Sequence, residues 1–200
     1  MRYMGYQVCD KRTLEPCDTL SPACLGGGAF GKAYAAVNTV EGDHYYAVKV
    51  VDIHQAVVRH ETTEGRIVKE VLLLKTLQHP NVVRYFPANR SADRDRRYLF
   101  IPMELCAGSL LDVVRRGPVP ADTLRQYMSE LAAGFRYLHD VKKLVHRDVK
   151  ADNILLGRDG GVRVGDLGQA ARAGATAEES ALMLTASSFK SLELQRGHVV

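Results

Sequence analysis

The chain has 200 residues, of which 46% are apolar and 25% are charged, so it can bury a sizeable core and is not disordered over its whole length. The net charge is only +4 and the basic residues are scattered rather than gathered in one tract, so nucleic-acid binding is not indicated. No uncharged apolar run of about 18 residues occurs and the N-terminus lacks the regions of a signal peptide, which favours a cytoplasmic protein without a membrane partner.

Residues 1–20 show no clear period, and we expect them to form an irregular lead-in. The four cysteines are Cys9, Cys17, Cys24 and Cys106. They include no C-x-x-C pair and have no histidines at zinc-finger spacing, so a cysteine metal site is not indicated. Free thiols in a reducing cytosol are favoured over a disulfide between Cys9 and Cys17.

A glycine-rich stretch follows Leu25, with glycines at Gly26, Gly28 and Gly31. Because glycine has no Cβ, the backbone here can approach a phosphate and aim its N–H groups at it. The G-x-G-x-x-G pattern also occurs in dinucleotide-binding folds, but those need a helix directly after the glycines. Residues 32–37 read as a strand and residues 38–43 as a hairpin turn, so a nucleotide-covering turn between two strands fits better.

The next predicted strand, residues 45–51, is apolar except for Lys49. Ala47 and Lys49 share one face of this strand, so a small residue can lie against a base while the ammonium group reaches phosphates. The alternative is a lysine at a strand edge that extends into water. A helix is then predicted from the spacing of Ile67, Val71, Leu74 and Leu77. It carries Glu70, which either pairs with Lys49 or is one more solvated charge.

Residues 98–106 read as a buried strand that runs into a linker at residues 107–109. Pro118 and Pro120 precede a strongly amphipathic helix. Its apolar stripe, which we expect to belong to the core, consists of Leu124, Tyr127, Met128, Leu131, Phe135 and Leu138.

The polar residues 146–153 lie between two short apolar runs, 144–145 and 154–156, which we expect to be buried strands. A loop held at both ends is a rigid platform for catalysis. Its chemistry-bearing side chains are those of His146, Arg147, Asp148, Lys150, Asp152 and Asn153. The alternative is a polar surface turn with chance spacing.

A turn at residues 157–161 and a predicted strand at residues 162–164 follow, and the strand ends at Asp166, Leu167 and Gly168. An isolated Asp-Leu-Gly would be a plain turn, and its weight comes from its place after the polar loop. Residues 170–185 are rich in Ala, Ser, Thr and Glu, as a mobile loop would be.

These motifs, in this order, resemble those of eukaryotic protein kinases over roughly residues 24–195. The polar loop matches the family's H-R-D-x-K-x-x-N pattern at every fixed position. The resemblance implies an α+β, two-lobed fold, with an antiparallel β-sheet and a C-helix in the N-lobe and a mainly helical C-lobe. It divides the chain into a lead-in over residues 1–20, an N-lobe and hinge over 21–106, and a partial C-lobe over 107–200.

The resemblance assigns catalytic roles to Asp148, Lys150, Lys49 and Glu70, and magnesium-binding roles to Asn153 and Asp166. The Asp148 carboxylate would accept the proton of the substrate hydroxyl, and Lys150 would lie beside the transferred phosphoryl group. Lys49, paired with Glu70, would bind the α- and β-phosphates of ATP.

The nucleotide-binding residues that the resemblance implies are Leu25, Gly26, Gly28, Gly31, Ala33, Ala47, Lys49, Met103, Glu104, Cys106 and Leu155. Met103 would guard the pocket behind adenine, and backbone groups from Glu104 to Cys106 would hydrogen-bond the base. Ala33 replaces the family's valine and would cover adenine less completely. Leu167 replaces phenylalanine, so it can fill an apolar slot with less buried area and would position the adjacent aspartate less firmly.

The match is weakest near the C-terminus. Candidate phosphorylation sites there are Thr176, Ser180 and Thr185. Thr185, beside Ala186, could replace the threonine that braces the substrate site in the family, and Ser191-Leu192-Glu193 stands in the place of Ala-Pro-Glu. Since the chain stops before the helices that complete the C-lobe, we expect a fragment, a truncated product, or a base supplied by a partner chain.

Lys150 favours Ser/Thr over Tyr as the acceptor, and residues 108–114 and 146–156 look most like the STE group of kinases, with the polo-like and NIMA-related groups as alternatives. Two functions remain open. The first is an ATP- and Mg²⁺-dependent protein serine/threonine kinase. The second is a catalytically weak or inactive kinase-like module that acts by contact.

Overall fold

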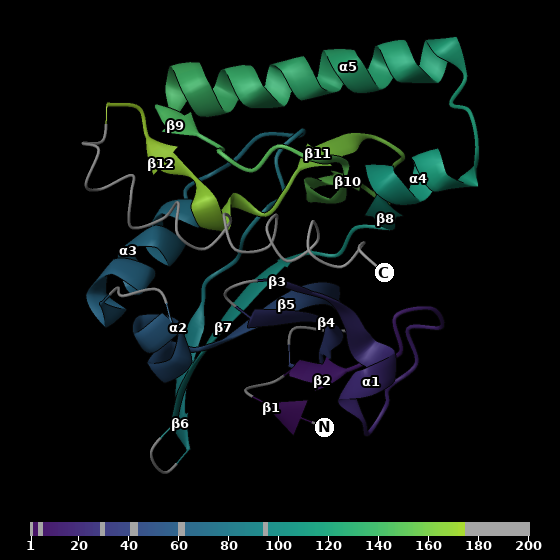
Figure 1. The fold of residues 1–200 in the computed structure, drawn as a ribbon. Helices are drawn as coiled ribbons and strands as arrows, with labels where there is room; N and C mark the ends of the chain where they lie inside the picture. The colour runs from purple at the N-terminus through teal and green to yellow at the C-terminus, as the bar shows by residue number, and fades with distance from the viewer. Residues whose placement is uncertain are drawn as a thin grey trace, which may run out of the picture.

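The computed structural model describes residues 2–3, 6–28, 31–40, 44–59, 63–93 and 96–174. Figure 1 shows a β-sheet flanked by helices in the lower part of the molecule, and a mainly helical part above it, with helix α5 across the top. The predicted α+β, two-lobed kinase-like fold is confirmed, and we call these two parts the N-lobe and the C-lobe. Within the described residues, no helix is both long enough and apolar enough to cross a membrane.

The N-lobe is built on one sheet in which neighbouring strands pair antiparallel, in the order β1-β2-β4-β5-β7-β6, with β3 also paired to β4. The strands are β1 (Arg2–Tyr3), β2 (Tyr6–Val8), β3 (Cys24–Gly28), β4 (Gly31–Asn38), β5 (His44–Asp52), β6 (Asn89–Asp93) and β7 (Arg96–Glu104). The predicted strands around the glycine-rich turn and around Lys49 are therefore present.

The prediction that residues 1–20 are irregular is wrong for part of that segment. Strand β2 pairs with β4, Tyr6 opposite Asn38 and Val8 opposite Ala36, and the short helix α1 spans Leu20–Ala23. Strand β2 has three residues, too few to show a period, and its partner β4 lies far along the chain. Strand β3 pairs with the same edge of β4, from Cys24 opposite Tyr34 onward, so β2 and β3 lie end to end along one strand.

Two helices, α2 (Ile53–Arg59) and α3 (Glu64–Leu74), lie beside this sheet (Figure 1). Ile67 and Leu74 of α3 are buried, which confirms the predicted amphipathic helix, although Leu77 lies beyond its end. The largest cluster of buried apolar side chains runs without a break from these helices into the C-lobe, where it includes Leu138 and Leu167.

The C-lobe combines helices with short strands. Its elements are β8 (Gly108–Ser109), α4 (Leu110–Arg116), α5 (Ala121–Arg136), a π-helical turn (Tyr137–Val141), β9 (Leu144–Val145), a 3-10 turn (Ala151–Asn153), β10 (Ile154–Leu156), β11 (Val162–Val164), a 3-10 turn (Leu167–Gln169) and β12 (Ala171–Arg172). Ser109 caps α4 in a reciprocal capping box with Asp112. The predicted strands on both sides of the polar loop are present, but Val145 is exposed rather than buried.

The apolar stripe of α5 is only partly core. Tyr127 in α5 and Leu138 in the π-helical turn after it are buried, but Leu124 is 47% exposed and Met128 is 59% exposed, which corrects the prediction that the whole stripe is covered. The helix packs closely on the turn after α3 at Gly134, near its C-terminus. A Cβ on Gly134 would lie 2.6 Å from the backbone oxygen of Asn81. The N-terminal half of α5 therefore leaves apolar side chains at the surface.

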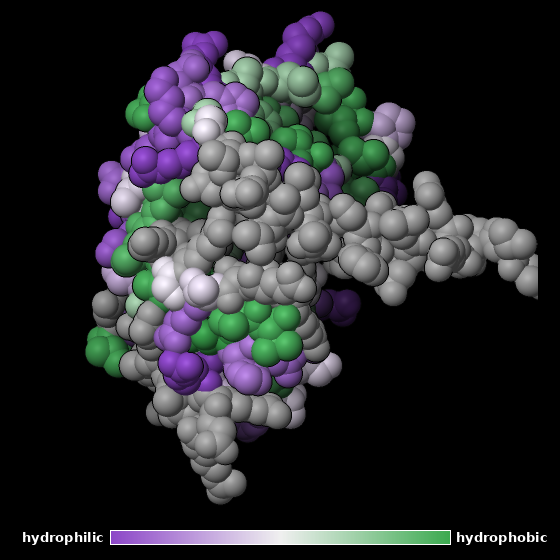
Figure 2. Space-filling view, turned by 60° about the vertical axis from the view of Figure 1, so that its left-hand side comes forward, coloured by the Kyte–Doolittle hydropathy of each residue, from purple (hydrophilic) through white to green (hydrophobic). Residues whose placement is uncertain are grey.

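The molecular surface mixes polar and apolar residues. Figure 2 shows hydrophilic (purple) and apolar (green) residues interleaved over the upper part of the molecule, and an apolar patch edged by hydrophilic residues on the lower half of this face.

Candidate active site

The polar loop at residues 146–153 is fixed by buried contacts at its start. His146 is 1% exposed, its Nε2 lies 2.8 Å from the backbone oxygen of Gly165, and its Nδ1 accepts a hydrogen bond from the backbone N–H of Asp148 at 3.2 Å. These two contacts require the proton on Nε2 and a lone pair on Nδ1. Arg147 has a positive φ of 65°, and its Nε donates to the backbone oxygen of Gln169. The loop is therefore held at a set distance from the strand that leads to Asp166.

Two predicted site residues, Lys150 and Asn153, contact the side chain of a third, Asp148. The Nζ of Lys150 lies 2.7 Å from the Oδ2 of Asp148. The Nδ2 of Asn153 donates both to this Oδ2, at 2.9 Å, and to the backbone oxygen of Asp148, at 2.7 Å. Both donors hold the same carboxylate oxygen, so the second oxygen of this fixed carboxylate is left to accept a proton.

Lys49 reaches from the N-lobe into the C-lobe. Its Nζ lies 3.1 Å from the Oδ1 of Asp166, whose side chain is 43% exposed. Partial burial raises the pKa of Asp166, but the charge of Lys49 and its hydrogen bond outweigh this, so the net pKa lies below the ordinary value. The predicted partner Glu70 lies in α3, but its side chain is outside the described structure, so the Lys49–Glu70 pair stays a prediction.

The two predicted magnesium ligands lie at the ends of neighbouring strands, with Asn153 just before β10 and Asp166 just after β11. Strands β10 and β11 pair with Ile154 opposite Val164, and the backbone N–H of Gly165 donates to the backbone oxygen of Asn153 at 2.8 Å. Since the amide nitrogen of Asn153 faces Asp148, its side-chain oxygen is the atom that remains for a metal. One carboxylate and one amide oxygen suit Mg²⁺, which takes few protein ligands and completes its shell with phosphates and water. The residues present therefore fit the ion.

Leu167 is 3% exposed and belongs to the main core, so it fills an apolar slot as predicted. Its backbone N–H donates to the hydroxyl of Tyr85, and burial raises the pKa of that phenol, which stays neutral. Asp166 itself has left-handed backbone, with φ 43° and ψ 60°. This is a conformation that aspartate tolerates better than most residues.

The glycine-rich hairpin forms as predicted on both sides of its tip, and residues 29–30 lie outside the description. Gly31 has a φ of 148°, and a Cβ there would lie 2.1 Å from the backbone oxygen of Val50, so no other residue fits without a shift. A Cβ on Gly26 would meet nothing within 4 Å. Leu25, just before it, is exposed.

The predicted base-binding residues gather where the sheet meets the hinge. Ala33 pairs with Lys49, Ala35 pairs with Ala47, and Ala47 also pairs with Met103, so these side chains share one face of the sheet. Because Lys49 reaches Asp166, this face looks toward the C-lobe.

The other predicted base contacts lie at the hinge and on β10. Cys106 and Leu155 are half-buried, as is Met103, and burial raises the pKa of the Cys106 thiol to about 12, so it stays protonated. The carboxylate of Glu104 turns to Arg163, so its backbone rather than its side chain is the group available to a base.

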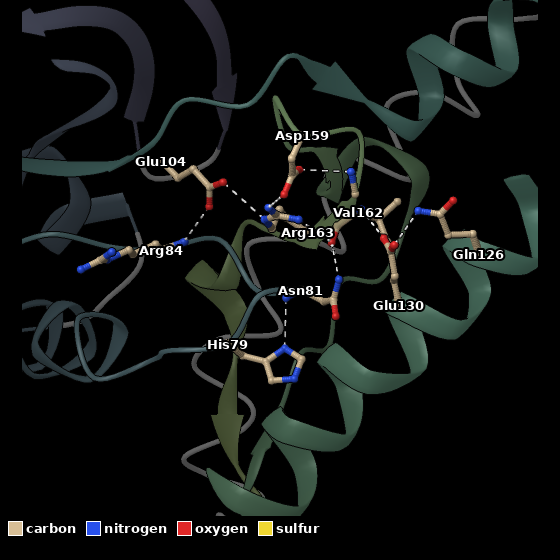
Figure 3. Close-up of polar contacts among 10 residues, drawn as sticks. His79, Asn81, Arg84, Glu104, Gln126, Glu130, Asp159, Val162 and Arg163 are labelled. Atoms are coloured by element: carbon tan, nitrogen blue, oxygen red, sulfur yellow. Dashed lines mark hydrogen bonds and ion pairs between the residues drawn. The ribbon is translucent and has the colours of Figure 1, made fainter. Parts of the chain in front are cut away.

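A polar network that the sequence reading did not single out holds strand β11 (Figure 3). Arg163 is 9% exposed, with its Nε 3.3 Å from the Oε1 of Glu104 in the hinge and its Nη2 2.6 Å from the Oδ2 of Asp159. Burial lowers the pKa of Arg163, but the carboxylates of Asp159 and Glu104 raise it by more. The net pKa is therefore raised and the guanidinium stays charged. A charged residue between two valines in a predicted strand was the available signal, because a charge that becomes buried needs partners.

The same strand is held from the other side by α5 and by the turn after α3. The Oε2 of Glu130 accepts the N–H of Val162 at 2.7 Å, and the Nδ2 of Asn81 donates to the Val162 oxygen at 3.1 Å. The N–H of Val164 donates to the Asn81 oxygen at 2.8 Å. Hinge, helix and turn therefore all fix the strand that carries Asp166.

Several predictions fall on residues that lie outside the described part of the chain. These are the phosphorylation sites Thr176, Ser180 and Thr185, the substrate-bracing position at Ala186, and Ser191-Leu192-Glu193.

Comparison with known proteins adds a second line of evidence. Residues 21–192 match the family model described as protein kinase domain. "Mitogen-activated protein kinase kinase kinase 1a" of Physcomitrium patens is 33% identical over 146 residues, which are 73% of this chain and 18% of that protein. "Cytokinesis protein sepH" of Aspergillus niger is 37% identical over 161 residues, 78% of this chain and 11% of that protein.

A third relative, "Mitogen-activated protein kinase kinase kinase ANP1" of Arabidopsis thaliana, is 36% identical over 171 residues, 83% of this chain and 24% of that protein. The chain therefore spans a quarter or less of the length of these relatives.

Proposed function

The chain belongs to the protein kinase domain family, and from this premise we propose that it transfers the γ-phosphate of ATP to serine or threonine hydroxyls of proteins. The observation that carries the proposal is that Lys150 and Asn153 both contact the carboxylate of Asp148. The paired strands β10 and β11 bring the Lys49–Asp166 pair to the same part of the molecule. The chain thus carries every charged residue that phosphoryl transfer would use, including Glu70, whose side chain lies outside the described structure.

The acceptor hydroxyl would be activated by Asp148. Its Oδ2 is held by Lys150 and Asn153, so the carboxylate is oriented before a substrate arrives. The proton of the hydroxyl would pass to this carboxylate as its oxygen attacks the γ-phosphorus, and ADP would leave. Lys150 would stay within reach of the transferred phosphoryl group and offset its negative charge.

The nucleotide phosphates would be held by Lys49 and by the glycine-rich hairpin. Lys49 has its Nζ at the boundary between the lobes, where it can exchange Asp166 for phosphate oxygens. Asn153 and Asp166 would hold a magnesium ion, which neutralises phosphate charge when it is bound. Lys49 would be oriented by Glu70.

The acceptor class rests on Lys150 in the catalytic loop and on the relatives, which carry names of mitogen-activated protein kinase kinase kinases. These names support the predicted likeness to the STE group. We propose that the protein is cytoplasmic, that its substrate is a protein with a Ser/Thr acceptor, and that it is regulated by phosphorylation at Thr176, Ser180 or Thr185. A partner chain that covers the exposed part of α5 belongs to the same proposal.

The test is a phosphorylation assay with radiolabelled ATP and a mixed Ser/Thr and Tyr peptide library, with Asp148→Asn as the matched variant. We expect label on Ser/Thr peptides and a loss of about 100-fold or more in the variant, which keeps the side-chain size but not the base. Equal labelling by both proteins would contradict the proposal.

A second function, a kinase-like module that acts by contact, is favoured by the smaller Ala33 on the base-facing side of the sheet. Thermal melting with and without Mg·ATP separates the two. A melting temperature that rises with Mg·ATP, and does not rise in Asp166→Ala, supports the enzyme, because a ligand that binds only the folded state must stabilise it. A clean melt unmoved by nucleotide supports the module.

A further inference from the structure

A tight loop before α1 has a defined shape. The backbone N–H of Leu14 donates to the oxygen of Asp10 at 2.8 Å, and the N–H of Asp10 donates to the oxygen of Glu15 at 2.9 Å. The Oδ1 of Asp10 accepts the N–H groups of Arg12, at 2.7 Å, and of Thr13, at 3.1 Å. Residues 10–15 therefore close on themselves, and Figure 1 shows this purple segment to the side of β4 and α1.

The side chain of Leu14 leaves this loop and packs at the nucleotide-facing side of the sheet. Leu14 is half-buried and contacts a small apolar cluster made of Ala35, Ala47 and Leu105, to which Met103 also packs. Ala47 and Met103 are two of the residues assigned above to the base, and Leu105 lies between two others, Glu104 and Cys106.

The strand register orders these side chains along the sheet. Lys49 and Ala33 form one cross-strand pair, and Ala47 and Ala35 form the next pair on the same face. Lys49 points to Asp166 and so marks the phosphate end. Leu14 packs on the pair farther from Lys49, which places it at the opposite end of the face, beside the hinge.

The backbone of Leu14 is unusual for its side chain. Its φ is 60°, in the left-handed region that asparagine and glycine adopt more easily than leucine. A residue needed only to close the loop would be better as asparagine. What leucine adds at this position is apolar area on the base-facing side of the sheet.

We propose that Leu14 is a nucleotide-binding residue that forms the end wall of the base site, contacting the edge of the adenine ring beside the hinge. The N-terminal loop is then part of the nucleotide site and contributes to its preference for a purine. This inference rests on the proposed function, because it presumes that the base lies against Ala47 and the hinge.

The test is calorimetric titration of the full chain with Mg·ADP and, separately, with magnesium tripolyphosphate, which has phosphates and no base. Leu14→Asn keeps a residue that suits the left-handed backbone and removes the apolar contact. Leu20→Ala, at an exposed leucine of the same segment, is the matched control. Leu14→Met restores apolar area as a conservative replacement.

We expect Leu14→Asn to bind Mg·ADP about fivefold more weakly, the loss that corresponds to about 40 Å² of apolar contact. Binding of tripolyphosphate should stay as in the wild type, and a cooperative melt without ligand should be kept, which shows that the variant folds. Leu20→Ala and Leu14→Met should bind Mg·ADP like the wild type.

Unchanged Mg·ADP affinity in Leu14→Asn, with a wild type that binds, would overturn the inference and leave the proposed function intact. An equal loss for Mg·ADP and tripolyphosphate would also overturn it, because the base would not be the group affected. A wild type that binds neither ligand would instead defeat the proposed function, and the base site with it.

Discussion

The ion pair between Lys49 and Asp166 is one of the contacts that join the two lobes. The folded-state pKa of Asp166 lies below its ordinary value of 3.8, so the unfolded chain binds more protons in acid and the stability from this group grows with pH. The contribution is fully present above the ordinary value and is lost as the pH falls through the folded-state value. Because the Asp166 side chain is 43% exposed, solvent screening keeps it below about 1 kcal/mol.

We therefore expect Asp166→Asn to lower the free energy of unfolding by less than about 1 kcal/mol at pH 7, and the difference from the wild type to shrink below about pH 4. Urea denaturation of both proteins between pH 7 and pH 3 measures this. A difference that stays constant down to pH 3 would assign the effect to shape rather than charge.

At the residue scale the motif spacing indicated which residues form the candidate site, and their catalytic and binding roles stay predictions. Asp148, Lys150 and Asn153 contact one another as expected for a short loop held at both ends by strands, because such a loop can place its side chains in few ways. The motif spacing did not predict that Asp166 pairs with Lys49 in the absence of a nucleotide. Pattern matching assigns each residue a ligand and is silent on what the residue contacts when that ligand is missing.

At the element scale, strand β11 depends on the buried Arg163. We expect Arg163→Ala to lower the free energy of unfolding by about 2 kcal/mol, because Glu104 loses its partner at the hinge and a cavity opens between Gly157 and Gly161. Arg125→Ala is the control, since Arg125 pairs with Asp122 on the exposed side of α5 and should cost less than about 0.5 kcal/mol. Urea denaturation compares the two, and equal losses would show that the Arg163 network is not special.

The glycine-rich hairpin offers a comparison between two of its glycines. Gly31→Ala should lower the free energy of unfolding by about 2 kcal/mol or more, because its Cβ would collide with the Val50 backbone and its φ of 148° suits only glycine. Gly26→Ala meets open space, so it should leave stability within about 1 kcal/mol. Its effect should appear in weaker Mg·ATP binding, where the added methyl group stands between backbone and phosphate. Thermal melts with and without Mg·ATP separate these effects.

At the scale of whole elements, long periodic segments were predicted well and short ones were not. The 16-residue α5 and the strands around Lys49 follow from their periods. The three-residue β2 does not, because it is too short to show a period and it joins the sheet through the distant strand β4. The exposed half of the α5 stripe was also mispredicted, since a period says which residues share a face but not what covers that face.

For the whole molecule, the exposed apolar face of α5 leads to a further prediction. Replacing Leu124 and Met128 together by glutamine should change the free energy of unfolding by less than about 1 kcal/mol, because Leu124 is already 47% exposed and Met128 59% exposed. Tyr127→Ala, on the buried side of the same helix, should cost about 3 kcal/mol. Urea denaturation tests both, and a large loss in the glutamine variant would show that the face is covered in the folded protein.

The shared edge of β4 has a consequence for how this domain can vary. Val8 and Cys24 pair with residues two apart on β4, so the segment between them begins and ends within about 7 Å. Both ends of this segment are anchored to the same strand, so the segment is an excursion from the sheet edge and connects no two other strands. Insertions or deletions there change loop length at a small entropic cost and leave the register of the other strands alone. Residues 10–22 could thus be replaced as one unit, in evolution or by design. Such a replacement would change Leu14, the side chain beside the hinge, and leave the catalytic loop unchanged.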